Sequence, residues 1–197
     1  MLHGKALQER LEMIASSSVG TVLEPMCGPG MLGDVLARRG IPYGGFDLNE
    51  QFVQYAKRRE HDVWVGDARS PDAYETVDTV ILSDTIHHVA LEDREQVIGT
   101  SASHADKRLI ILEPHMDRLK SWIPNVPGAE QLVRAWFDYI ERDGVNAARY
   151  NNGMSKKELE HQLRNGFGVL PDFKLNSVRE IGEDLLAVYD RISDITS

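Results

Sequence analysis

Apolar and polar positions follow two alternating patterns along most of the chain. Short runs that are apolar almost throughout, as in strands buried on both faces, occupy residues 21–24, 41–47, 62–67, 77–84 and 108–114. Between them lie segments with apolar residues at helical spacing, at residues 31–39, 49–60 and about 92–103. This alternation predicts a parallel sheet covered by helices on both faces.

The second helical segment shows the signals most clearly. Asn49 suits the N-cap position, and Phe52, Val53 and Ala56 are expected to share the buried face. The basic run Lys57–Arg59 then falls on the same helix, where it is typical of a solvated face rather than of a nucleic-acid contact.

Another helix is predicted near the C-terminus. Ser155 and Glu158 have the spacing of a capping box, and Met154 can pack on Leu159 as a hydrophobic staple. Gly166 suits the end of this helix.

The last part of the chain predicts a different kind of strand pairing. Two strand-like runs, 172–182 and 184–192, meet at a short turn around Gly182, as in an antiparallel hairpin. The whole pattern predicts an α/β fold, with a Rossmann-like, doubly wound, mostly parallel seven-stranded sheet that ends in this C-terminal antiparallel hairpin. At 197 residues, the chain is expected to form one domain over residues 1–197.

Composition and net charge restrict the classes of partner that can be expected. A formal net charge of -9 disfavours nucleic acid, whose backbone is bound chiefly through Lys and Arg. No apolar run approaches the roughly 20 residues that cross a bilayer, and the first residues lack the apolar centre of a signal peptide, so we expect a cytoplasmic protein without membrane contact. Cys27 is the only cysteine, and no Cys/His spacing suggests a metal site.

A glycine-rich loop follows the first strand in the stretch VLEPMCGPGMLG. Gly28, Gly30 and Gly33 form the pattern G-x-G-x-x-G, which lets the backbone turn sharply and approach a ligand. Asp47 ends the next strand, where an acid can bind the ribose of an NAD cofactor as well as it can bind the ribose of S-adenosylmethionine. The first strand is otherwise mainly apolar, but its last residue is the acid Glu24. From the loop alone, a dinucleotide and S-adenosylmethionine both remain open.

The order of several motifs resembles the class I S-adenosylmethionine-dependent methyltransferases over nearly the whole chain. Glu24–Gly30 matches the family's acid-x-G-x-G-x-G, with Met26 at the first glycine position. The segments ILSDTIHHV and LIILEP resemble the motifs of the fourth and fifth strands in small-molecule members. MSKKELEHQLRNGF resembles the helix before the terminal hairpin.

The resemblance implies that S-adenosyl-L-methionine is the cofactor. The acid at Asp47 would bind both ribose hydroxyls, and Asp67-Ala68 would contact the adenine. The positive sulfonium and ammonium groups of this ligand make nearby acids favourable. The implied cofactor-binding residues are Glu24, Met26, Gly28, Gly30, Asp47, Leu48, Asp67, Ala68, Ser83 and Asp84.

Three histidines are candidate catalytic residues. His87 and His88 follow the fourth strand and His115 follows the fifth, at the edge where open α/β sheets bind ligands. A histidine with a pKa of about 6.5 can act as a base at neutral pH. For His88, a packing role at the start of the next helix competes with the role of a base. The choice between these two roles is also undecided for His87. Metal binding by these histidines is not expected.

We therefore expect methyl transfer to a small-molecule acceptor, at oxygen, with nitrogen and carbon acceptors left open. The signatures of nucleic-acid base methylation, N/D-P-P-Y/F and Pro-Cys, are absent from the sequence. Residues 115–150 form an aromatic-rich segment that is expected to be a helical insertion covering the substrate.

Two alternatives remain: a non-catalytic S-adenosylmethionine-binding module, favoured by Met26, and an NAD-dependent oxidoreductase. The sequence does not decide the oligomeric state, and both a monomer and a homodimer remain open.

Overall fold

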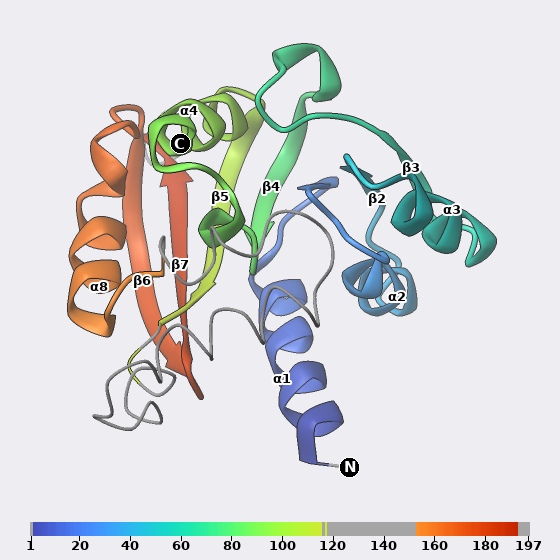
Figure 1. Ribbon diagram of the computed structural model, residues 1–197, viewed down its shortest axis with the longest axis horizontal. Helices are drawn as coiled ribbons and strands as arrows, with labels where there is room; N and C mark the ends of the chain where they lie inside the picture. The colour runs from blue at the N-terminus through green and yellow to red at the C-terminus, as the bar shows by residue number, and fades with distance from the viewer. Residues whose placement is uncertain (1, 116, 118–152, 193–197) are drawn as a thin grey trace, which may run out of the picture.

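The computed structural model of the protein describes residues 2–115, 117 and 153–192. Its centre is a seven-stranded sheet with the order β3-β2-β1-β4-β5-β7-β6. The first five strands pair in parallel, and β7 runs antiparallel to both β5 and β6 (Figure 1). The strands are β1 (Val22–Pro25), β2 (Tyr43–Asp47), β3 (Asp62–Val65), β4 (Val77–Ser83), β5 (Ala105–Pro114), β6 (Phe173–Ile181) and β7 (Asp184–Arg191). The predicted fold class, including the terminal hairpin, is confirmed.

Helices connect the parallel strands. The described α-helices are α1 (Leu2–Ser17), α2 (Met31–Arg38), α3 (Glu50–Arg58), α4 (Arg94–Ser103) and α8 (Lys156–Arg164). Short 3-10 turns cover Pro71–Ala73, Ile86–His88, Leu91–Asp93 and Gly166–Gly168. The turn Ile86–His88 follows β4 directly, so the sequence ILSDTIHHV leaves the sheet at its carboxyl edge. Nearly all of the expected insertion 115–150 lies outside the described residues.

The sheet separates two apolar cores. In β5, Leu109 and Ile111 face the core that α4 and α8 cover, whereas Ile110 and Leu112 face the core that α1 and α2 cover. All four side chains are almost fully buried, with exposed fractions of 1% or less. This two-sided burial explains why the strand reads as a continuous apolar run rather than as an alternating one.

The predicted helix signals are mostly confirmed. The Asn49 side chain accepts a hydrogen bond from the backbone N–H of Gln51, and Ser155 with Glu158 forms the complete capping box. The prediction for Phe52 was wrong, because its side chain is 43% exposed while Val53 is 2% exposed. Val53 and Ala56, which are three residues apart, form the buried stripe of helix α3. Phe52 lies beside this stripe.

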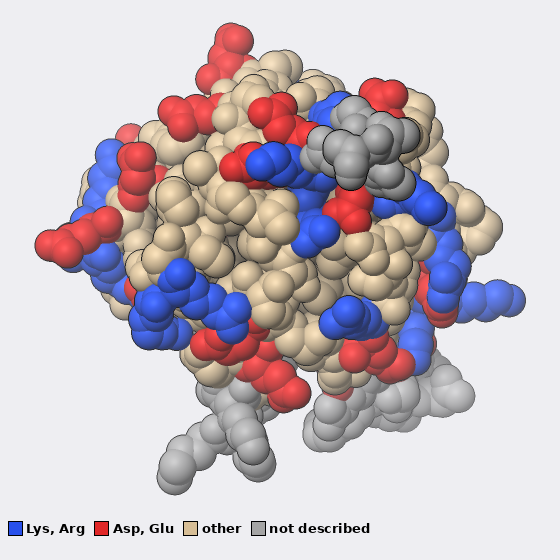
Figure 2. Space-filling view, turned by 180° about the vertical axis from the view of Figure 1, so that it is seen from behind, with Lys and Arg blue, Asp and Glu red and all other residues tan. Residues whose placement is uncertain are grey.

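Charged side chains are mixed on the surface. On the face seen from behind, Lys and Arg lie next to Asp and Glu (Figure 2). Among the described residues, no helix has the length and apolar character needed to cross a membrane.

The fold creates one natural position for a ligand. The strand order reverses between β1 and β4, because β2 and β3 lie on one side and β5 on the other. At such a switch point the two connecting segments leave the sheet in opposite directions and open a crevice at the carboxyl ends of the strands. The glycine-rich loop after β1 and the turn after β4 both lie at this edge.

Candidate functional site

The glycine-rich loop after β1 leaves its backbone accessible. Gly28 and Gly30 have φ values of 53° and 73°, in the left-handed region that favours glycine. A Cβ atom built on Gly28 would meet no other atom within 4 Å, so a ligand can approach this part of the backbone. A Cβ on Gly33 would lie 2.7 Å from the ring of Tyr43, which explains the third glycine by helix–sheet packing.

Met26 also adopts the left-handed conformation, with φ of 55°. For a residue with a side chain this conformation costs about 1–2 kcal/mol, which explains why the family pattern has glycine at this position. The Met26 side chain is partly buried and packs against the core on the α4 side of the sheet. This packing offsets the strain and gives the side chain a structural role.

Asp47 joins two loops at the end of β2. One carboxylate oxygen accepts a hydrogen bond from the Gly28 N–H at 2.8 Å, and the other accepts from the Asn49 N–H at 2.8 Å. Each carboxylate oxygen can accept a further bond, so this carboxylate can still bind hydroxyl groups. Leu48, the next residue, is 64% exposed and offers an apolar surface beside the acid.

Glu24 lies beneath the loop rather than on its surface. It is 5% exposed, and its carboxyl accepts a hydrogen bond from the Tyr43 O–H at 2.7 Å. Burial raises the pKa of Glu24 to about 8, and the nearby Asp47 charge raises it further, while the bond from Tyr43 opposes the shift. The carboxyl is therefore mostly protonated at neutral pH. The structure places Glu24 close to Asp47 but directs its carboxyl to Tyr43.

Asp67 and Ala68 follow β3. The Asp67 carboxylate holds the Arg69 side chain through bonds of 2.6–3.1 Å, and this pairing lowers the pKa of Asp67. Arg69 also lies 3.6 Å from Asp93. Ala68 is buried, and its carbonyl accepts a hydrogen bond from the Tyr74 O–H at 2.9 Å. The polar end of Asp67 is thus engaged by a partly exposed arginine.

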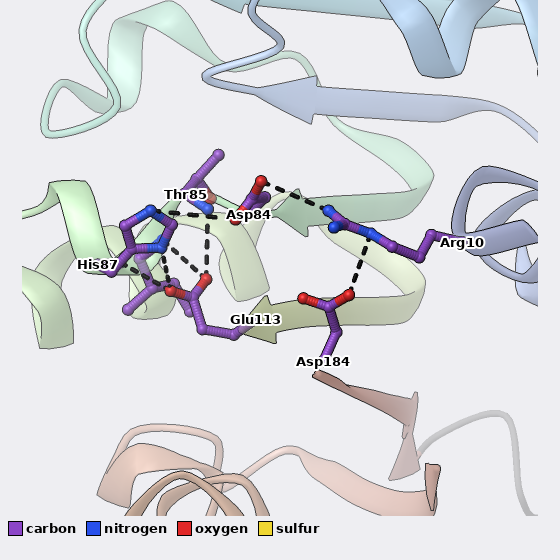
Figure 3. Close-up of polar contacts among 7 residues, drawn as sticks. Arg10, Asp84, Thr85, His87, Glu113 and Asp184 are labelled. Carbon is purple, nitrogen blue, oxygen red and sulfur yellow. Dashed lines mark hydrogen bonds and ion pairs between the residues drawn. The ribbon is translucent and has the colours of Figure 1, made fainter. Parts of the chain in front are cut away.

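A second group of polar side chains lies at the ends of β4, β5 and β7 (Figure 3). Asp84 directly follows Ser83, the last residue of β4, and has φ of 58°. The Asp84 N–H donates to the carbonyl of Leu112 at 2.8 Å, which fixes the start of the turn against β5. The carboxylate of Glu113, which is 1% exposed, then accepts bonds from the backbone of the turn.

His87 is the histidine most deeply placed in this group. Its Nδ1 lies 2.5 Å from Oε1 of Glu113, and its Nε2 lies 3.9 Å from Oδ1 of Asp84. The side chain is 3% exposed. The ring of His88 lies against it, with 4.1 Å between the ring centroids. His115 lies apart at the end of β5, where its N–H donates to the Glu183 carbonyl at 3.0 Å.

Helix α1 contributes an arginine to the same group. The Arg10 guanidinium forms ion pairs with Asp184 at 3.2 Å and with Asp84 at 3.4 Å (Figure 3). Burial raises the pKa of Asp184 to about 6, against the opposing effect of Arg10, and the charges of Asp84 and Glu113 raise it further. Arg10, Glu113 and Asp184 were not identified from the sequence.

Several buried polar atoms in this group have no hydrogen-bond partner within the described part of the chain. They are Asp84 Oδ1, Thr85 Oγ1, His87 Nε2 and Arg10 Nε, the last of which still forms the ion pair with Asp184; outside the group, His115 Nδ1 is another. Buried polar groups are usually satisfied, so unsatisfied ones mark a place where a ligand or water completes the set. Over residues 2–115, 117 and 153–192, no cluster of three or more His, Cys, Asp or Glu side chains has the arrangement of a metal site.

Comparisons with known proteins agree with this architecture. Residues 22–107 match the model of a family described as "Methyltransferase domain". No curated protein sequence matches the chain significantly. Many solved structures do.

Three of the similar structures illustrate the range. A magnesium protoporphyrin IX methyltransferase from Synechocystis PCC 6803, with bound SAH, has 18% identity and a TM-score of 0.63, covering 94% of this chain and 84% of its own. The PH0226 protein from Pyrococcus horikoshii OT3 has 23% identity and a TM-score of 0.64, covering 95% and 89%. The mitomycin 7-O-methyltransferase MmcR has 14% identity and a TM-score of 0.61, covering 92% of this chain but 52% of its own.

These findings define the fold of the protein. Residues 22–107, somewhat less than half of the chain, match the methyltransferase-domain model, and the whole architecture is that of solved methyltransferase structures, which is the fold that the motif order predicted. At identities below one quarter, the structural likeness defines the fold, and the substrate has to be argued from this chain's own residues.

Proposed function

We propose that this protein transfers a methyl group from S-adenosyl-L-methionine to a small-molecule acceptor. The observation that carries the proposal is the accessible Gly28 backbone, tied to the Asp47 carboxylate at the strand-order reversal. A nucleoside ligand needs this combination: a loop without side chains for close approach, and an acid for its ribose hydroxyls. The similar structures with bound SAH and SAM support the choice of ligand.

The chain's residues fit such a cofactor. In this proposal, Gly28 and Gly30 approach it with their backbone, and Asp47 accepts bonds from the ribose hydroxyls with its remaining lone pairs. The exposed Leu48 covers one face of the adenine, while Asp67 and Ala68 contact its edge. Ser83 and Asp84, at the end of β4, face the methionine portion, and Glu24 and Met26 support the loop from below. When bound, the cofactor supplies a methyl group already activated by positive sulfur.

The acceptor side determines the reaction. Alignment of an attacking atom with the methyl group can supply about 7–11 kcal/mol, so a methyltransferase needs few catalytic groups. We propose an oxygen acceptor, with His87 as the base that takes the proton of the hydroxyl group. His87 is favoured over His88 and His115 because its Nε2 is buried beside Asp84 without a partner among the described residues. One of the similar structures is a mitomycin 7-O-methyltransferase, which is in keeping with oxygen as the acceptor.

The rest of the proposal concerns the surroundings of the site. Residues 115–150 would cover the acceptor as part of a single domain over 1–197. A cytoplasmic location, and partners that include neither nucleic acid nor membrane, remain part of the proposal. The mixed charge pattern on the face shown in Figure 2 fits this choice, since protein surfaces that bind nucleic acid are mostly basic.

Calorimetric titration tests the cofactor assignment. We expect SAH to bind, and Asp47→Ala to weaken it about 10–100-fold by removing two charge-assisted hydrogen bonds. Asp62→Ala is the matched control, because Asp62 is an exposed acid on the neighbouring strand β3. Tighter binding of NAD(H) than of SAH, or unchanged affinity in Asp47→Ala, would contradict the assignment.

A second experiment separates an enzyme from a binding module. The protein is incubated with methyl-labelled S-adenosylmethionine and fractionated small-molecule extracts. Labelled product in any fraction supports the transferase. Cofactor binding with no labelled product in any fraction would instead support the non-catalytic module.

A further inference from the structure

Among the described residues, the carboxylate of Glu113 contacts four donor groups, and it is only 1% exposed. Oε2 accepts hydrogen bonds from the N–H groups of Thr85 at 3.2 Å and Ile86 at 3.1 Å. Oε1 accepts from the N–H of His87 at 2.9 Å and lies 2.5 Å from Nδ1 of the same residue. Glu113 thus holds both the backbone of the turn and the ring that projects from it (Figure 3).

This arrangement determines which ring nitrogen carries the proton. Three backbone N–H groups can only donate, so both carboxylate oxygens of Glu113 act as acceptors toward the turn. An ionised carboxylate can only accept, so the fourth partner, Nδ1 of His87, has to be the protonated nitrogen. In the neutral ring, Nε2 then carries the lone pair.

The free nitrogen faces the unsatisfied part of the site. Nε2 of His87 is buried without a partner within the described residues, and so is Oδ1 of Asp84 at 3.9 Å from it. Both atoms are acceptors, and 3.9 Å is too long for a direct hydrogen bond between them. A group that donates a hydrogen bond at this place would remove the cost of leaving these acceptors unsatisfied.

We propose that Glu113 is the positioning residue of the reaction: it fixes the Nδ1–H tautomer of His87, so that Nε2 is aimed at the hydroxyl group of the acceptor. This inference rests on the proposed function, which it deepens. As the acceptor oxygen forms its bond to the methyl carbon, the carbon–sulfur bond breaks with its electron pair going to sulfur. The hydroxyl proton passes to Nε2, and the resulting imidazolium lies between the carboxylates of Glu113 and Asp84 until it loses the proton to water.

The tautomer can be measured without knowing the acceptor. Nitrogen-15 NMR of the full chain with labelled histidine distinguishes protonated from unprotonated ring nitrogens, and the spectrum of His87→Asn assigns the His87 signals. We expect the neutral His87 ring in the wild-type protein to show protonated Nδ1 and unprotonated Nε2. Protonated Nε2 in the neutral ring would overturn the proposal, and this measurement needs no variant of Glu113 that folds.

Glu113→Gln tests the cause. With the amide oxygen in the place of Oε2, the bonds from Thr85 and Ile86 are kept and only the bond from the His87 backbone N–H is lost, whereas the reverse orientation loses two backbone bonds. The NH2 group then faces Nδ1 of His87 and favours the opposite tautomer, Nε2–H. The matched control is Glu24→Gln, the same change at another buried carboxyl that contacts Tyr43 instead. We expect the tautomer to switch in Glu113→Gln and to stay as in the wild type in Glu24→Gln. An unchanged tautomer in a folded Glu113→Gln protein would refute the positioning role.

Rate measurements connect the tautomer to the reaction once a labelled product is found. Glu113→Gln is expected to lower kcat at least 100-fold while leaving SAH affinity within about twofold. A wild-type kcat in a variant with a switched tautomer would refute the link to catalysis. Failure of the proposed function would appear separately, as a lack of SAH binding alongside an unaltered tautomer.

Discussion

The two halves of the crevice are built in different ways. On the side of β1 and β2, the functional groups are backbone of a glycine loop and one carboxylate, Asp47, that bonds to N–H groups nearby. On the side of β4, β5 and β7, they are buried ionisable side chains that contact one another across the sheet. In the proposed function, the first half binds the nucleoside part of the cofactor. The second half has its own charge balance and its own unsatisfied atoms, which is why we propose that the acceptor is selected there.

The largest expected effect concerns the second half. Glu113→Ala leaves three backbone N–H groups and the His87 ring without their acceptor in a buried place. Breaking a buried charged network of this kind costs about 3–5 kcal/mol of the free energy of unfolding, which urea denaturation can measure. Glu75→Ala, at an exposed loop position, should change it by less than about 0.5 kcal/mol. A similar loss in both variants would show that Glu113 has no special role in stability.

The next largest effect is on the pH dependence of folding stability, and it comes from Glu24 on the side of β1 and β2. Burial raises the pKa of Glu24 from its ordinary value of 4.5 to about 8 in the folded state, so the folded protein binds a proton that the unfolded chain releases. This contribution is complete below pH 4.5 and is lost as the pH rises toward 8. Between pH 5 and pH 7 the loss amounts to as much as about 3 kcal/mol. Glu24→Gln, which cannot ionise, should therefore show a flatter decline of stability over this range in urea denaturation. Parallel curves for the two proteins would mean that Glu24 is ionised in the folded state.

A third experiment compares two glycines with the same backbone strain. Gly28 and Gly40 have φ values of 53° and 67°, and a Cβ on either would meet nothing within 4 Å. Substitution by alanine should cost each about 1–2 kcal/mol of folding stability. Only Gly28→Ala should also weaken SAH, about 10–100-fold by calorimetry, because the new methyl group occupies the space through which the ligand approaches. Equal SAH affinity in the two variants would place the ligand elsewhere.

The smallest effect concerns the ion pairs of helix α1. Arg10→Ala leaves the Asp184 carboxylate without its counter-charge, at a cost of about 1–2 kcal/mol when that carboxylate is ionised. Because the pKa of Asp184 is about 6, the destabilisation should be larger at pH 8 than at pH 5. Arg38→Ala is the control, since its partner Glu12 lies 3.8 Å away and its side chain is 57% exposed. A pH-independent effect of Arg10→Ala would argue against the pairing.

The contrast between the halves also explains what the sequence could predict. The proximity of the glycine loop and Asp47 could be predicted because it depends on local backbone geometry and on one rule, that parallel strands end at a common edge. The capping box of α8 is local in the same way. Phe52 was misplaced because neighbouring positions at the border of a helical stripe are hard to separate by spacing alone.

The second half could not be assembled from sequence. Arg10 meets Asp84 across 74 positions of the chain, and Glu113 meets His87 across 26. No periodicity relates such residues, because their contact depends on how β4 lies beside β5 and how α1 packs on the sheet. The motif LIILEP did contain Glu113, but its sequence pattern indicated only the strand.

The reversed direction of β7 has a consequence for how this architecture can change. Its pairing with β5 places Asp184 opposite Pro114, so the beginning of the last strand, and not its end, reaches the rim where the parallel strands finish. The hairpin tip therefore lies beside Arg10 and the residues after β4, although it is far downstream in the polypeptide. If the proposed function holds, insertions or exchanges at this tip would alter the choice of acceptor and leave the glycine loop after β1 unchanged.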